Sequence, residues 1–250
     1  MMMGAPGDTE MTTLWGFNNR EVKNQAIEVR CGFVRKVYGI LTIQLLFTAI
    51  VAYQFWKNGQ DRAWLRSHEW LLWLSVATTF VTVCVMACCR DVCRRFPANY
   101  IFLFTFTGFE GVMIGFVSAY FSWESLLLAT ATTVLIFVVF TIFAFQTKTD
   151  FTGMGMYAFG AGVVLLVFGL VVCGLGAFGV TIPLLVAIWD IIGIMVFTFY
   201  IVFDTQLIMG AWGGHRESFS IDDYCYAALN LYMDIVNLFL HVLSLIGQRN

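Results

Sequence analysis

The stretch Tyr157–Phe178, YAFGAGVVLLVFGLVVCGLGAF, contains no charged residue. The hydrocarbon core of a bilayer is about 30 Å thick, and an α-helix of roughly 20 apolar residues crosses it. This stretch therefore predicts a membrane-spanning helix. Six further stretches are comparably long and mostly apolar: Val37–Trp56, Trp70–Cys89, Tyr100–Phe121, Ser125–Phe145, Ile182–Phe203 and Asp222–Ile246.

The overall composition agrees with these stretches. Of the 250 residues, 60% are apolar and 12% are charged, whereas about 25% of a typical soluble domain is charged. We expect an all-α integral membrane protein with about seven transmembrane helices in contact with membrane lipid. Residues 1–36 form a tail, whose first half we expect to be disordered, and residues 37–250 form the membrane domain. A net charge of −2 provides no basic domain for nucleic acid.

The distribution of lysine and arginine predicts the orientation, because cytoplasmic segments carry an excess of these residues. With a cytoplasmic N-terminus, ten of the fourteen lie on the cytoplasmic side. The other four are Lys57, Arg62, Arg66 and Arg249. We therefore expect the N-terminus in the cytoplasm. Seven spans place the C-terminus on the opposite side, whereas a re-entrant last segment would return it to the cytoplasm.

Some ionisable side chains lie inside the predicted spans or at their ends: Glu110, Asp190, Asp204, Asp234 and His241. A charge at the bilayer centre costs about 2.5–3.5 kcal/mol on insertion scales, so these residues are functional candidates. The alternative is a hydrogen bond between helices that only fixes packing. Asp190 and Asp204 are 14 residues apart. That is close to four helical turns, so both lie on one helix face at different depths and could mark a path across the bundle.

The last span carries a polar stripe. Asn230, Asp234, Asn237 and His241 follow the spacing i, i+4, i+7, i+11, which places them on one face of a helix. In a membrane such a face must turn to the bundle interior or to a water-filled cavity. A ladder of interhelical hydrogen bonds would explain the asparagines, but asparagine would serve that purpose at position 234 without a charge. We expect a functional role for Asp234.

Asp204 is a candidate partner for Asp234, because a short connection joins the last two spans and they are expected to pack antiparallel. Two adjacent carboxylates in a low-dielectric surrounding cannot both ionise cheaply, so such a pair shares a proton and can sense pH. Carboxylate oxygens are also ligands for Ca²⁺. Two carboxylates with an amide or two suit transient passage of calcium better than storage.

Three arginines lie on the same predicted cytoplasmic side: Arg90, Arg94 and Arg95. One of them could form a salt bridge with an aspartate and act as a latch. The other interpretation is that they follow the general excess of positive charge on that side.

A glycine repeat suggests close helix packing. Gly155, Gly162, Gly169 and Gly176 recur every seven residues along the span quoted first. Such a stripe of small residues lets a neighbouring helix backbone approach closely.

Several motifs around these residues resemble one family. FDTQLIMG at residues 203–210, Asp222–Tyr224 and AALNLYMDIVNLFL at residues 227–240 are similar to the transmembrane Bax inhibitor motif family, above all its lifeguard and glutamate-receptor-associated branch. Val34–Tyr38, Arg94–Asn99 and Gln146–Phe151 fit the same family. The resemblance covers about residues 26–247.

The resemblance implies a seven-helix fold with a central last helix. It also implies a pH-sensitive calcium leak across intracellular membranes such as the endoplasmic reticulum or Golgi, and suppression of programmed cell death. The family's pH-sensing aspartate pair maps onto Asp204 and Asp234. Its latch arginine is best matched by Arg90, although the spacing allows Arg94. Glu110 stands in for an acidic residue that some bacterial members carry on helix two. Calcium is then the transported ion, and no cofactor is expected.

Two other classes of protein compete with this interpretation. Intramembrane aspartyl proteases also carry aspartates on two adjacent late helices. However, Asp234 lacks their Gly-x-Gly turn, and no proline follows Pro183 to form their substrate-docking loop, so we do not expect an enzyme. The remaining alternative is a non-conducting membrane protein that regulates calcium channels or cell-death proteins by contact.

Overall fold

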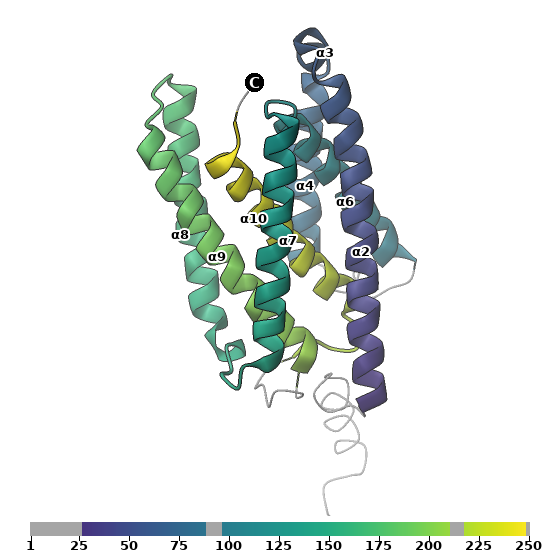
Figure 1. The fold of residues 1–250 in the computed structure, drawn as a ribbon. Helices are drawn as coiled ribbons and strands as arrows, with labels where there is room; N and C mark the ends of the chain where they lie inside the picture. Colours follow the sequence, from purple (N-terminus) through teal and green to yellow (C-terminus); the bar gives the residue numbers. More distant parts are fainter. Residues whose placement is uncertain (1–26, 89–96, 211–217, 249–250) are drawn as a thin grey trace, which may run out of the picture.

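A computed structural model describes residues 27–88, 97–210 and 218–248. The described chain is helical and has no extended sheet. Its elements are α2 (Ile27–Asn58), α3 (Arg62–Ser67), α4 (Glu69–Cys88), α6 (Ala98–Ser118), α7 (Trp123–Gln146), the short 3₁₀ helix η2 (Thr152–Met154), α8 (Gly155–Ala177), α9 (Pro183–Met209) and α10 (Tyr224–Ile246). Figure 1 shows the long helices side by side in one bundle.

The structure confirms an all-helical, multi-pass membrane protein. Six described stretches are long and apolar enough to cross a bilayer: α2, α6, α7, η2 with α8, α9 and α10. The second predicted span, Trp70–Cys89, falls on α4, a helix of 20 residues that packs against α6. Helix α4 is not one of those six stretches, and the structure describes its side chains only in part.

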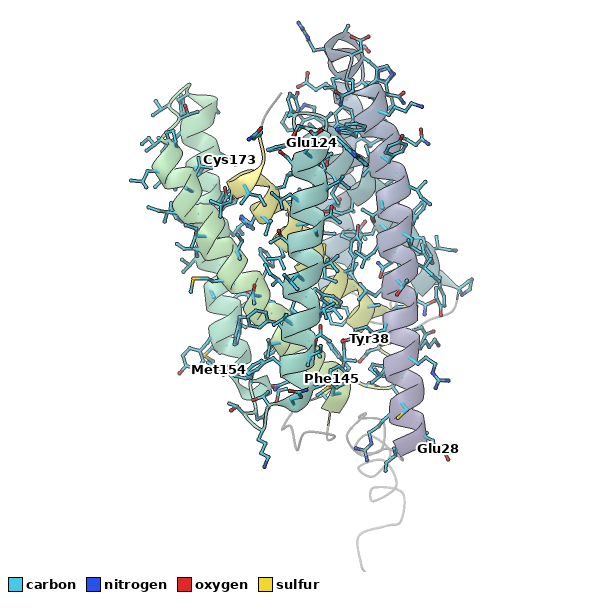
Figure 2. All side chains as sticks on the ribbon, viewed as in Figure 1. Glu28, Tyr38, Glu124, Phe145, Met154 and Cys173 are labelled. Atoms are coloured by element: carbon cyan, nitrogen blue, oxygen red, sulfur yellow. The ribbon has the colours of Figure 1, made fainter. Side chains whose placement is uncertain are left out.

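The contacts at the two ends of the bundle show that α4 also runs its length. At one end Asn99, early in α6, donates to the Tyr224 hydroxyl at the start of α10 (3.0 Å). At the other end a Cβ added to Gly59, just after α2, would contact Ala119, just after α6. Because α2 ends where α6 ends, α4 must return the chain to the start of α6. Figure 2 shows these ends, with Glu28 and Met154 at one and Glu124 at the other.

The last described residues lie at the end opposite to Ile27. The Gln248 amide donates to Ser125 Oγ (2.8 Å), and the Ser122 amide donates to the Gln248 carbonyl (3.1 Å). Helix α10 therefore runs through the bundle and does not turn back, so the re-entrant alternative for the last segment does not hold.

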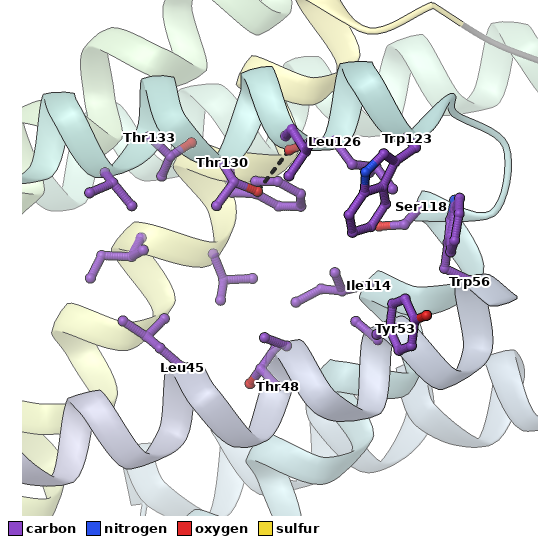
Figure 3. Close-up of a pocket in the computed structure, with 17 residues that line it drawn as sticks. Leu45, Thr48, Tyr53, Trp56, Ile114, Ser118, Trp123, Leu126, Thr130 and Thr133 are labelled. Carbon is purple, nitrogen blue, oxygen red and sulfur yellow. Dashed lines mark hydrogen bonds between the residues drawn. The ribbon is translucent and has the colours of Figure 1, made fainter.

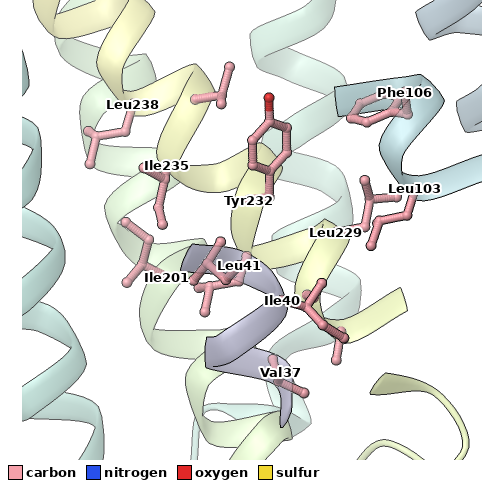
Figure 4. Close-up of a cluster of buried hydrophobic side chains, with 14 of the residues drawn as sticks. Val37, Ile40, Leu41, Leu103, Phe106, Ile201, Leu229, Tyr232, Ile235 and Leu238 are labelled. Carbon is pink, nitrogen blue, oxygen red and sulfur yellow. The ribbon is translucent and has the colours of Figure 1, made fainter. Parts of the chain in front are cut away.

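Helix α10 is central, as the resemblance implied. It packs against α9, α2, α7 and α6. Leu231, Tyr232 and Leu238 are fully buried. Figure 4 shows Tyr232 and Leu238 in a cluster that also contains Leu41 of α2 and Ile201 of α9. The core of the molecule therefore surrounds the last helix.

Two helices are longer than the apolar runs that predicted them. Helix α2 begins at Ile27, so the boundary placed at residue 36 falls within a continuous helix. Helix α9 continues past Phe203 to Met209 and ends at Gly210, whose φ of 58° is readily adopted by glycine. Asp204 thus lies within the last two turns of α9. The first half of the tail, expected to be disordered, lies outside the described residues.

The glycine stripe packs differently from the prediction. It admits aromatic rings of α9 and not a neighbouring backbone. A Cβ added at Gly155 would lie 3.6 Å from Phe203, one at Gly169 would lie 3.0 Å from Trp189, and one at Gly162 would overlap the Tyr200 hydroxyl. A Cβ at Gly176 would meet nothing within 4 Å.

Candidate functional site

The carboxyl groups of Asp204 and Asp234 meet between α9 and α10. A side-chain hydrogen bond joins them, and the two residues are 7% and 5% exposed. Asp234 Oδ2 has no hydrogen-bond partner among the described residues. The extension of α9 beyond Phe203 brings Asp204 to the depth of Asp234. The structure therefore brings together the two side chains that the sequence singled out as a pair.

Gln206 fixes the end of α9 beside this pair. Its Oε1 accepts from the amide of Phe151 and its Nε2 donates to the carbonyl of Thr149, both at 2.9 Å. The side chain is fully buried. It ties α9 to the connection between α7 and α8, two residues from Asp204.

Neutral polar side chains link α2 to α6 and α10. Gln44 Nε2 donates to Thr107 Oγ1 (3.0 Å), and the hydroxyls of Thr48 and Tyr232 are 2.7 Å apart. All four residues are buried. Tyr232 lies two positions before Asp234, so this network positions the helix that carries the pair.

Glu110 is buried on α6 at 2% exposure. Its Oε2 accepts a hydrogen bond from Thr79 Oγ1 on α4 (3.1 Å). Helix α4 thus supplies a hydroxyl, and α6 supplies the acid. Glu110 takes no part in the hydrogen bond between Asp204 and Asp234.

The polar stripe on α10 serves different partners. His241 Nδ1 lies 3.0 Å from Asp190 Oδ1 on α9. Asn237 donates to the Met233 carbonyl of its own helix (2.8 Å), and Asn230 is half-buried. The stripe is therefore not one continuous ladder. Its two ionisable members each pair with an aspartate of α9, at separate points.

The proposed latch residues Arg90 and Arg94 lie outside the described residues, as does Arg95. No group of three or more His, Cys, Asp or Glu side chains gathers as a metal site in the described part of the chain.

A separate cavity of about 410 Å³ lies between α2, α6, α7 and α10 (Figure 3). Its lining is mostly apolar and includes Leu45, Ile114 and Phe239. Thr130 and Thr133 also line it, but their hydroxyls donate to carbonyls of their own helix, each at 2.8 Å. With no carboxylate in its lining, this cavity lies apart from the candidate site.

Comparisons with known proteins identify the family. Residues 30–250 match the family described as inhibitor of apoptosis-promoting Bax1. Protein lifeguard 3 of Homo sapiens is 35% identical over 223 residues, which are 89% of this chain and 70% of that protein. Bax inhibitor 1 of Schizosaccharomyces pombe is 33% identical over 232 residues, which are 92% of this chain and 82% of that protein. The chain belongs to the Bax inhibitor family.

The match to the Bax inhibitor family confirms the resemblance seen in the motifs. It covers the whole described bundle except Ile27, Glu28 and Val29 of α2. A second mammalian relative, Protein lifeguard 3 of Mus musculus, is 34% identical over 223 residues, which are 89% of this chain and 71% of that protein. This Bax inhibitor family member is thus a multi-pass membrane protein in contact with lipid.

Sequence reasoning missed several polar residues of this Bax inhibitor family bundle. Each of them forms a side-chain hydrogen bond to a residue outside its own helix: Gln44, Thr48, Thr107, Gln206 and Ser244. The signal was present, because a glutamine within an apolar span is costly without a partner. A search restricted to charged side chains passes over it.

Proposed function

We propose that this family member is an anti-apoptotic membrane protein that acts as a pH-sensitive calcium leak in an intracellular membrane, the endoplasmic reticulum or Golgi, with its N-terminus in the cytoplasm. Calcium is the transported ion, and neither a cofactor nor enzymatic activity is part of the proposal. The observation that carries it is the hydrogen bond between the buried carboxyl groups of Asp204 and Asp234.

The chemistry of the pair supports conduction. A carboxyl pair in a low-dielectric surrounding holds a proton between its two members, which gives the site a charge that depends on pH. Carboxylate oxygens are hard ligands suited to Ca²⁺. Two of them bind weakly enough to release the ion again, and release is a condition for conduction. Glu110 on α6 would extend the acidic path.

The sign of gating follows from the proton. Near neutral pH the pair keeps one shared proton and a net negative charge, which an arginine such as Arg90 or Arg94 can hold in a closed state. Acid on the cytoplasmic side adds the second proton, removes the charge and releases the arginine. The leak should therefore increase as the cytoplasmic side is acidified.

Calcium flux in liposomes tests this proposal. The purified protein should pass Ca²⁺, and the flux should rise on acidification. In Asp204→Asn and Asp234→Asn the ratio of acidic to neutral flux should fall, and in the double variant it should fall to about one, because an amide has no proton to exchange in this range. Glu124→Gln is a matched control, since Glu124 is exposed at the start of α7, and it should keep the pH dependence.

The possible failures are separable. Absence of flux at every pH overturns the leak and leaves a protein that regulates channels or cell-death proteins by contact. Flux that keeps its pH dependence in both aspartate variants overturns the role of the pair. Flux that rises with pH contradicts the gating mechanism.

A further inference from the structure

A second ionisable cluster lies between α9 and α10. Ser244 Oγ donates to Asp190 Oδ2 (2.6 Å), and His241 Nδ1 is 3.0 Å from Asp190 Oδ1. Asp190 is 1% exposed and His241 is 6% exposed. Both carboxylate oxygens are therefore occupied, one by a hydroxyl and the other by an imidazole.

The imidazole of His241 fits closely against α9. The Trp189 ring meets it edge-on with centroids 4.6 Å apart, and the Phe197 ring stacks on it at 5.7 Å. A Cβ added at Gly193 would overlap the imidazole ring. Among these described contacts Asp190 is the ionisable group. The environment thus fixes the ring while leaving its protonation to be set by one carboxylate.

This cluster is remote from the Asp204–Asp234 pair. Asp190 precedes Asp204 by 14 residues on α9, which corresponds to about 21 Å along a helix. Ser244 lies in the last turn of α10, which ends at Ile246. The cluster is therefore close to the end of the bundle where α10 ends, whereas Asp204 is near the end where α9 ends.

The cluster has two states that differ by one proton. One proton must lie in the hydrogen bond between Nδ1 and Oδ1, because one of these atoms has to donate. With that proton alone the cluster carries one negative charge. Uptake of a second proton on the imidazole leaves an imidazolium beside a carboxylate, with no net charge.

We propose that Asp190, His241 and Ser244 form a proton-binding site that is separate from the Asp204–Asp234 pair. Proton uptake there neutralises a buried charge and strengthens the link between α9 and α10 near the end of α10. The site does not depend on calcium conduction and exists whether or not the protein is a leak.

Nuclear magnetic resonance of a single histidine tests the proposal. The sequence has three histidines, so His68→Gln with His215→Gln leaves His241 as the only signal of a ¹³C-imidazole-labelled protein in nanodiscs. The His241 resonance should change with pH. In Asp190→Asn the change should move to lower pH, because the imidazolium loses its carboxylate. In Ser244→Ala it should move to higher pH, because the carboxylate loses a donor and attracts the proton more strongly.

Two controls separate this site from general effects. Thr133→Val should leave the titration in place, because the Thr133 hydroxyl bonds within α7. Asp234→Asn should also leave it in place if the two sites are independent. A His241 resonance that stays constant with pH, or that titrates identically in Asp190→Asn and Ser244→Ala, overturns the proposal. Displacement by Asp234→Asn overturns the separation of the two sites.

Discussion

Gln206 holds the end of α9 through an uncharged side chain. Its amide pairs with two backbone groups, the N–H of Phe151 and the carbonyl of Thr149. The Gln206 side chain is fully buried, and a buried amide without hydrogen-bond partners is costly. Gln206 thus keeps the connection between α7 and α8 in place beside Asp204.

Replacement of this side chain should be destabilising. In Gln206→Ala the free energy of unfolding should fall by about 1–3 kcal/mol, because the hydrogen bonds of the fully buried Gln206 side chain to Phe151 and Thr149 are lost. Thermal unfolding in detergent micelles measures this. Gln60→Ala is the matched control, since Gln60 is exposed and bonds to the Trp56 carbonyl one turn before it. Equal melting temperatures for the two variants would contradict the role given to Gln206.

Charge made part of the site predictable from sequence. Glu110, Asp204 and Asp234 were found because an acid within an apolar run has a large cost in lipid. Their partners were harder to find. Thr79 is 31 residues from Glu110, and Asp190 is 51 residues from His241. Such pairs follow from how helices pack, and periodicity along a single helix does not reveal that packing.

At the scale of the element, α8 packs against α9 at positions where it lacks a side chain. Tyr200 donates to the Ala158 carbonyl (2.7 Å) and Trp189 donates to the Leu165 carbonyl (3.2 Å), each beside a glycine of α8. Glycine here makes room for a ring whose polar atom reaches the α8 backbone. This is the local reason for Gly162 and Gly169.

Two glycines of α8, Gly160 and Gly162, provide a sharp test. Gly162→Ala should lower the free energy of unfolding by about 1 kcal/mol, because the new Cβ displaces the Tyr200 hydroxyl from its hydrogen bond. Gly160→Ala should be neutral or stabilising by up to about 1 kcal/mol, since alanine is the better helix former and nothing lies within 4 Å of the added Cβ. Chemical denaturation in micelles compares them. A Gly160 variant as destabilised as the Gly162 variant would refute this packing.

The centres of the helices were predictable, but their ends were not. Hydropathy locates a span because about 20 residues must be apolar. It misses the start of α2, which is charged at Glu28 and Arg30, and the end of α9, which carries Asp204 and Gln206. The bundle buries Asp204 and Gln206 in the last turns of α9, whereas Glu28 in the first turn of α2 is exposed. Apolar character alone predicts neither of these helical turns.

For the whole molecule, the odd number of passages through the bundle fixes its topology. The connections after α2 and α6 and the C-terminal Gln248 lie at one end, and the connection between α7 and α8 lies at the other. Length and composition predicted about seven spans, and six described helices meet these criteria. The central position of α10 was not predictable from them, because hydropathy does not distinguish a helix among helices from a helix among lipids.

Cysteine accessibility tests this topology. In a background without the seven native cysteines, a membrane-impermeant maleimide should label Ser67→Cys and Gln248→Cys from the same side of sealed vesicles. It should label Lys148→Cys from the other side, since a charged reagent does not cross the bilayer. All three positions are exposed. Labelling of Gln248→Cys together with Lys148→Cys would contradict seven passages.

The central position of α10 has a consequence for how the protein is made. Chains are synthesised from the N-terminus, so α2, α6, α7 and α9 enter the membrane before the helix they surround. Until α10 arrives, the surfaces that will bury Tyr232 and Leu238 have no partner, and Asp204 has no Asp234. The last helix to be translated therefore completes the core and the aspartate pair in a single late step of assembly.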